Sequence, residues 1–126
     1  MDPVHLFKLG FDRLSWLSTR QSAIAGNVAN ANSPGYAARE IEPFDQEMKR
    51  FHLRLTATQP RHMDIRGAEV AQGIAKEADP WAVSASGNSV SLEQEMLKQV
   101  NVAADQSLAT ATVRSFHKMM LLAART

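Results

Sequence analysis

Histidine and acidic side chains are the groups in this 126-residue sequence that could bind a metal ion or move a proton. The four histidines, His5, His52, His62 and His117, are far apart, and no pair has the i, i+4 spacing that places two imidazoles on one face of a helix. His62 and Asp64 could form a general-base pair, but no Gly-x-Ser-x-Gly elbow or phosphate-binding glycine loop accompanies them. The sequence therefore predicts no metal site, no cofactor and no enzymatic activity.

Asparagine is the other polar residue whose spacing suggests a defined role. Residues 25–36 read Ala-Gly-Asn-Val-Ala-Asn-Ala-Asn-Ser-Pro-Gly-Tyr, and Asn27, Asn30 and Asn32 lie at the end of a long helical pattern. Residues 33–35 end that pattern, because proline lacks an N–H and glycine accepts a positive φ. The segment is either a simple helix stop or a fixed set of amide hydrogen bonds. We expect the asparagines to bond the backbone at this junction or a neighbouring subunit, and to bind no metal or substrate.

Charge and composition exclude several classes of protein. Lysine and arginine number 14 against 13 acidic residues, and the net charge is +2 over residues 1–63 and −1 over the remainder, so we expect no nucleic-acid partner. There is no cysteine, hence no disulfide. The amino terminus has no apolar run typical of a cleaved signal peptide, and the longest uncharged stretch, residues 21–38, is too polar to cross a membrane as a helix.

Apolar residues recur at three- and four-residue steps from Pro3 to about Asn30, which predicts one long helix of roughly 40 Å. A helix of this length in so short a chain needs a partner along its length. Two heptad columns can be traced in it: one holds Phe7, Leu14, Gln21 and Val28, and the other holds Gly10, Leu17, Ile24 and Ala31. The predicted packing stripe consists of Phe7, Phe11, Leu14, Leu17 and Ile24.

The carboxy-terminal segment predicts a second long helix. Ser91 followed by Gln94 fits a capping box, and Glu93 and Glu95 place negative charge in the first turn. Its many alanines would allow close approach of neighbouring helices. Its predicted stripe runs through Leu92, Met96, Val100, Ala104, Leu108, Ala111, Met119 and Leu122. Together with the stripe of the first helix, Val100, Leu108, Met119 and Leu122 form the predicted helix-packing stripe.

The middle of the chain is less regular. Phe44, Met48, Phe51 and Leu55 favour a short helix after Pro43, although the alternation of residues 51–55 leaves a strand open for its last turn. Glycines and prolines interrupt residues 56–88, which predicts loops with room for a small β-hairpin.

The two tryptophans differ in what their positions indicate. Trp16 lies off the main stripe, which favours a contact outside the pair of terminal helices. Trp81 follows Pro80 in a loop and could equally be an interface anchor or a core residue.

Together these patterns predict a mainly α fold in which long N- and C-terminal helices pair like a coiled coil, with a short middle helix and a loop-rich insert. The expected divisions are an amino-terminal helix and junction over 1–35, a connecting segment over 36–88 and a carboxy-terminal helix over 89–126. Two long helices with so weak a middle bury little surface alone, so we expect further contacts from other subunits. A free-standing helical adaptor or regulatory module is the alternative.

Residues 27–36 resemble the amino-terminal signature of the bacterial flagellar rod and hook proteins, which usually read Asn-(Ile/Leu/Val)-Ala-Asn-x-x-Thr-Pro-Gly-Tyr. Ser33 replaces the commoner threonine, and Gly26 occupies a position often held by asparagine. Residues 87–96 and the Thr-x-Pro-x-His turn of residues 58–62 are similar to the short proximal rod members of this family. The motif residues that carry over are Asn27, Val28, Ala29, Asn30, Asn32, Ser33, Pro34, Gly35 and Tyr36, followed by Gly87, Asn88, Val90, Leu92, Glu95 and Met96 at the start of the return helix.

The resemblance implies a structural, non-catalytic subunit of the periplasmic rod of the flagellar basal body, exported without cleavage of a signal peptide. It also implies polymerisation through the terminal helices into a helical tube that encloses the export channel and transmits torque. The partners it implies are further copies of the chain, rod proteins of the FlgC and FlgF type, the adapter FliE, the flagellar export gate and the MS ring. No direct membrane span is expected.

Overall fold

The computed structural model describes residues 3–51 and 75–124. In chain order these form helix α1 (Pro3–Ala29), strand β1 (Arg39–Ile41), helix α2 (Phe44–Phe51), strand β2 (Ala75–Glu77) and helix α3 (Leu92–Ala123). The predicted mainly α fold with two long terminal helices is confirmed. The middle helix is confirmed over Phe44–Phe51, whereas Leu55, His52, His62 and Asp64 and the Thr-x-Pro-x-His turn lie outside the described residues.

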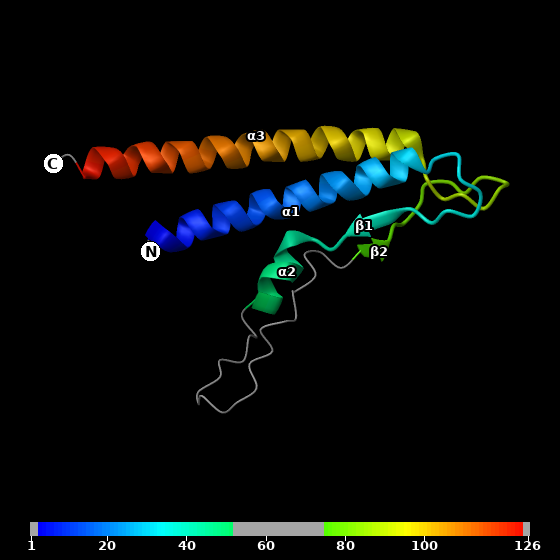
Figure 1. Ribbon diagram of the computed structural model, residues 1–126, viewed down its shortest axis with the longest axis horizontal. Coiled ribbons are helices and arrows are strands. Elements are labelled where there is room, and N and C mark those ends of the chain that lie inside the picture. Colours follow the sequence, from blue (N-terminus) through cyan, green and yellow to red (C-terminus); the bar gives the residue numbers. More distant parts are fainter. Residues whose placement is uncertain (1–2, 52–74, 125–126) are drawn as a thin grey trace, which may run out of the picture.

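The two long helices lie side by side and antiparallel, so that both chain ends are found at the same end of the molecule (Figure 1). Their contacts define one register. Phe7 packs edge-on against Phe116 with ring centroids 5.2 Å apart, Arg13 Nη2 lies 3.1 Å from Asp105 Oδ2, and the Asn27 side chain reaches Glu95. The helix pair therefore holds together along its length by alternating apolar and polar contacts.

The buried core lies nearer the junction end of this pair. It consists of Trp16, Leu17, Ile24, Ile41 and Val102, with Ala23, Phe44 and Ala109 packed against it. Trp16 donates its indole N–H to the carbonyl of Glu42 at 2.9 Å and packs edge-on against Phe44 with ring centroids 5.9 Å apart. Trp16 thus contacts the segment that leads into α2, as its position off the stripe predicts.

The inward face of α3 repeats every seven residues, at Glu95, Val102, Ala109 and Phe116. It faces the Gly10, Leu17 and Ile24 column of α1, in which Leu17 and Ile24 are fully or almost fully buried. Both helices therefore use heptad columns along their contact, as expected for antiparallel coiled-coil-like packing.

The apolar stripe traced in α3 from its sequence lies on the opposite, outward face. Within this chain Leu92, Met96, Val100, Leu108, Met119 and Leu122 are all exposed, as is Phe11 of α1, whereas Phe7 and Leu14 are half-buried. The apolar periodicity could not separate the two faces because α3 is apolar on both. The packing of the outward residues against other subunits stays a prediction.

The two strands pair antiparallel, with Arg39 opposite Glu77 and Ile41 opposite Ala75. This pairing differs from the small hairpin expected within residues 56–88, because β1 precedes α2 and only β2 lies in that range. Three-residue strands give too little pattern to be recognised in a sequence. None of the helices in the described part of the chain is long and apolar enough to span a membrane.

Gly10 marks the closest approach of the two helices. A Cβ atom built there would lie 2.7 Å from Cγ2 of Val113, a side chain that is stiff on a helix. Gly26, in the same helix, has open space around it.

We predict that Gly10→Ala lowers the free energy of unfolding by about 1–3 kcal/mol because the helices must separate, despite the better helix propensity of alanine. Gly26→Ala is the matched control and should raise the unfolding free energy by about 0.5–1 kcal/mol. Urea denaturation measures both, and Val113→Ala should partly rescue Gly10→Ala. An equal gain in stability at the two glycines would contradict the close approach.

Candidate functional site at the helix junction

The end of α1 is built from its own asparagine and serine side chains. Asn30 donates its side-chain amide to the carbonyl of Gly26 at 2.8 Å and accepts a hydrogen bond from the Ser33 hydroxyl at 3.1 Å. The chain then turns through Gly35, whose φ of 70° lies in the left-handed region that glycine adopts without strain. The Gly26 carbonyl also accepts the backbone N–H of Asn30 at 3.2 Å, so the Asn30 side chain reinforces the last turn of the helix.

Asn88, in the loop before α3, bonds the carbonyl groups that follow the end of α1. Its Nδ2 lies 2.8 Å from the carbonyl oxygen of Asn30, 3.0 Å from that of Ala31 and 2.7 Å from that of Ser33. Its Oδ1 accepts from the Val90 N–H at 2.8 Å, and the side chain is 3 % exposed. One buried amide therefore binds the end of α1 to the residues that precede α3.

Asn27, one turn before the end of α1, also bonds backbone groups through its side-chain amide, and it is fully buried. Its Nδ2 donates to the carbonyl of Arg39 at 2.7 Å, and its Oδ1 accepts from the Arg39 N–H at 2.9 Å. The side-chain amide thus pairs with both main-chain groups of one residue, as a neighbouring strand would. Its remaining partners are Glu95 Oε2, at 3.1 Å from Nδ2, and the Tyr36 hydroxyl, which donates to Oδ1 at 3.4 Å.

The two loops at this end of the molecule are bonded to each other by their backbones. The Gly35 N–H donates to the carbonyl of Ser86 at 3.0 Å, and the Ser89 N–H donates to that of Tyr36 at 3.0 Å. The Ser89 hydroxyl accepts from the Ala38 N–H at 2.8 Å. Gly87, with a φ of 78°, makes the turn before Asn88, and a Cβ added there would meet the Cα of Gly35 at 3.7 Å.

Helix α3 begins at Leu92 with Ser91 as its N-cap, as the sequence predicts, and the Ser91 hydroxyl accepts from the Gln94 N–H at 3.5 Å. The reciprocal half of the predicted capping box is replaced by other bonds. The Gln94 side chain donates to the carbonyl of Asp79 at 3.0 Å and accepts from the Trp81 N–H at 3.4 Å. Gln94 therefore fastens the loop after β2 to α3, and the indole of Trp81 is left 65 % exposed.

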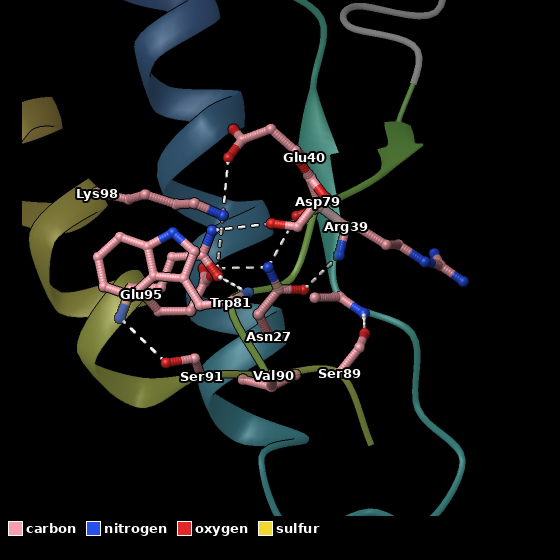
Figure 2. Close-up of polar contacts among 12 residues, drawn as sticks. Asn27, Arg39, Glu40, Asp79, Trp81, Ser89, Val90, Ser91, Glu95 and Lys98 are labelled. Carbon is pink, nitrogen blue, oxygen red and sulfur yellow. Dashed lines mark hydrogen bonds and ion pairs between the residues drawn. The ribbon is translucent and has the colours of Figure 1, made fainter. Parts of the chain in front are cut away.

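A chain of charged groups extends from Asn27 toward β1 (Figure 2). Glu95 is 1 % exposed, and its Oε1 lies 2.9 Å from Lys98 Nζ. That ammonium lies 3.0 Å from Glu40 Oε2 on β1, and Glu40 Oε1 lies 3.0 Å from Arg20 Nε on α1. Two acids and two bases thus alternate between α3, β1 and α1, so that the buried Glu95 has partners for both carboxylate oxygens.

The network shifts the pKa values of two of its members. Burial alone would raise the pKa of Glu40, but hydrogen bonds and positive charge from Lys98 and Arg20 outweigh it and hold that pKa below its ordinary value. Burial would likewise lower the pKa of Lys98, whereas the hydrogen bonds and charges of Glu95 and Glu40 raise it above its ordinary value. Both groups are therefore stabilised in their charged forms.

The other motif residues lie toward the surface. Asn32, Pro34, Val28 and Ala29 are exposed, and among the hydrogen bonds of the described residues none involves the Asn32 side chain. His5 and His117 are exposed on α1 and α3, where the His117 ring lies 6.2 Å from the ring of Phe7.

Four residues of the site were not predicted from the sequence: Arg20, Glu40, Ser89 and Lys98. The only local signal for any of them was the i, i+3 spacing of Glu95 and Lys98.

Comparisons with known proteins identify the family. No protein-family model matches the chain. It is 34 % identical to the flagellar basal body rod protein FlgB of Agrobacterium fabrum, over 97 % of this chain and 94 % of that protein. The chain belongs to the FlgB family. FlgB of Proteus mirabilis is 35 % identical and FlgB of Escherichia coli 30 % identical, each over 67 % of this chain and 67 % of the relative. The resemblance to rod proteins drawn from residues 27–36 and 87–96 is thereby confirmed at the level of the family.

We predict that Asn88→Ala lowers the free energy of unfolding by about 2–3 kcal/mol, because it leaves the Ala31 carbonyl and the Val90 N–H without a partner and weakens the bonding of the Asn30 and Ser33 carbonyls. Asn88→Asp should be as damaging, since its second oxygen cannot donate to those carbonyls. The exposed Asn32→Ala is the control and should change stability by less than about 0.5 kcal/mol. Thermal unfolding of the three variants checks this; equal effects at positions 88 and 32 would contradict it.

The lowered pKa of Glu40 predicts a loss of stability in acid. The unfolded pKa of glutamate is about 4.3, so the stability that Glu40 contributes is complete above that pH and is lost as the pH falls through the lower folded value. Conversely, the raised pKa of Lys98 gives stability that is complete below about pH 10.4 and is lost as the pH rises through the folded value.

Glu40→Gln should therefore be less stable than the parent near neutral pH, and the difference should shrink as the pH falls below about 4. Urea unfolding at a series of pH values measures this. Glu77→Gln, at the exposed position opposite Arg39, is the control and should follow the parent. A stability difference between Glu40→Gln and the parent that stays constant across the acid range would show that Glu40 is not the titrating group.

Proposed function

We propose that this chain is a non-catalytic structural subunit of the proximal rod of the flagellar basal body. The proposal rests on the match to FlgB of Agrobacterium fabrum over 97 % of this chain, supported by two further FlgB proteins over 67 % of it, since these relatives are named as basal body rod proteins. The chain polymerises through its terminal helices into a helical tube that encloses the export channel and transmits torque. It is exported without cleavage of a signal peptide and resides in the periplasmic rod.

The outward face of α3 supports assembly. Met96, Val100, Leu108, Met119 and Leu122 are 56–68 % exposed in the single chain, and they lie opposite the inward column that already packs on α1. A cluster of exposed apolar side chains of this kind on one side of a helix is typical of a protein interface. Neighbouring subunits are the partners that would cover it, namely further copies and rod proteins of the FlgC and FlgF type.

The remaining partners follow from the position of a proximal rod subunit. The adapter FliE, the MS ring and the flagellar export gate would contact the membrane-proximal end of the tube. The junction of α1, β1 and α3 has an architectural role in this proposal, because its buried asparagines bind backbone groups and Glu95 binds Asn27 and Lys98. A free-standing adaptor would share the helices but would not be built into basal bodies.

The outward face can be tested by placing a charge on it. Val100→Glu and Leu108→Glu should leave the melting temperature of the isolated subunit within about 2 °C, because both side chains are exposed. In a strain that lacks the native gene, both variants should abolish swimming and be absent from purified basal bodies. Gln99→Glu, also exposed on α3 but seven residues before Gln106, which bonds Gln21 of α1, is the control for added charge. Normal motility with all three variants would contradict the assembly role of this face.

A further inference from the structure

Glu95 lies where three parts of the molecule meet, although it touches the strand pair of β1 and β2 only through intermediaries. One carboxylate oxygen accepts from Asn27, which binds both main-chain groups of Arg39 in β1. The other accepts from Lys98, whose ammonium also binds Glu40 in β1. One polar connection between this part of α3 and β1 therefore passes through the Glu95 carboxylate and Asn27, and the other is the Lys98–Glu40 ion pair, whose ammonium the same carboxylate holds (Figure 2).

Only a carboxylate fits the hydrogen-bonding pattern at position 95. Asn27 presents an N–H group to one oxygen and Lys98 presents an ammonium to the other, so both partners are donors. A glutamine of the same shape has one acceptor and one NH₂ group. Whichever way that amide is turned, a donor would face a donor in a site that is 1 % exposed.

The strand pair depends on this network more than the helix pair does. The two helices keep contacts of their own away from Glu95, including the buried Leu17 and Val102, the Phe7–Phe116 ring contact and the Arg13–Asp105 ion pair. β1, by contrast, is three residues long. It contributes one side chain, Ile41, to the core, and its other attachments to the helices are polar: the Asn27–Arg39 bonds and the Glu40 ion pairs with Arg20 and Lys98.

We propose that the Glu95 carboxylate acts as a latch: it holds the strand pair on the helices, and loss of its charge releases the strand pair while α1 and α3 stay paired. The latch is a property of the single subunit and does not depend on the proposed function. It makes the position of the strand pair a two-state feature that can change without unfolding the helices.

Amide hydrogen exchange of the full chain tests the latch residue by residue. The reporters of the strand pair are the Arg39 N–H, bonded to Asn27 Oδ1, and the Ala78 N–H, bonded to the carbonyl of Ala38. The Val102 N–H, in the middle of α3, reports on the helices. Glu95→Gln should lower protection at Arg39 and Ala78 by at least about tenfold and change Val102 by less than about twofold.

Glu93→Gln is the matched control, because Glu93 lies in the same first turn of α3 but is exposed. It should leave all three amides unchanged. Equal loss of protection at all three amides in Glu95→Gln would contradict the proposed latch, because the carboxylate would then stabilise the helices and the strand pair equally. Unchanged protection at Arg39 would overturn it as well.

Lys98→Met supplies a second test that does not require Glu95→Gln to fold. It removes the ammonium but keeps the Asn27–Glu95 bond, so we expect a smaller loss of protection that is again confined to Arg39 and Ala78. In the double variant no ammonium faces the glutamine amide, and the loss should be smaller than the product of the two single losses. A loss equal to that product, or one spread over the helices in Lys98→Met, would contradict the latch.

Discussion

The fold of this chain depends on the buried side-chain amide of Asn27, which bonds both main-chain groups of Arg39 and the carboxylate of Glu95. Without it, both main-chain groups of Arg39 and one oxygen of the buried Glu95 would lose a partner inside the protein, which is costly. Asn88 does the same for the carbonyls that follow the helix. The side-chain amides of Asn27 and Asn88 therefore join four segments: α1, β1, the loop before α3 and α3 itself. They hold the end of α1 next to the start of α3.

From that point the helix pair follows simple packing rules. Seven-residue columns on α1 and α3 face each other, and Gly10 permits the close approach at Val113. α3 carries a second apolar face that nothing within the described chain covers. A helix with apolar residues on opposite sides suits a subunit that packs on its own first helix and on neighbours at once, which is what a rod built from FlgB-family proteins would require.

Much of the architecture could be predicted from the sequence because long helices leave strong periodic and capping signals, as at Pro3, Pro43 and Ser91. The Asn27–Tyr36 segment also predicted the junction. The strand pair and the charge network could not be predicted, since three-residue strands have no period. In addition, Asn27 lies 68 residues from its partner Glu95, and Glu40, the partner of Lys98, lies on β1. The inward and outward faces of α3 could not be told apart for a related reason: both are apolar.

The most direct measurement is a density map of intact basal bodies that contain this chain, at a resolution that shows side chains. We predict that the chain lies at the membrane-proximal end of the rod, with the outward residues Val100, Leu108 and Leu122 of α3 buried against a neighbouring subunit. A map without the chain in the rod, or with that face of α3 open to solvent in every copy, would contradict it.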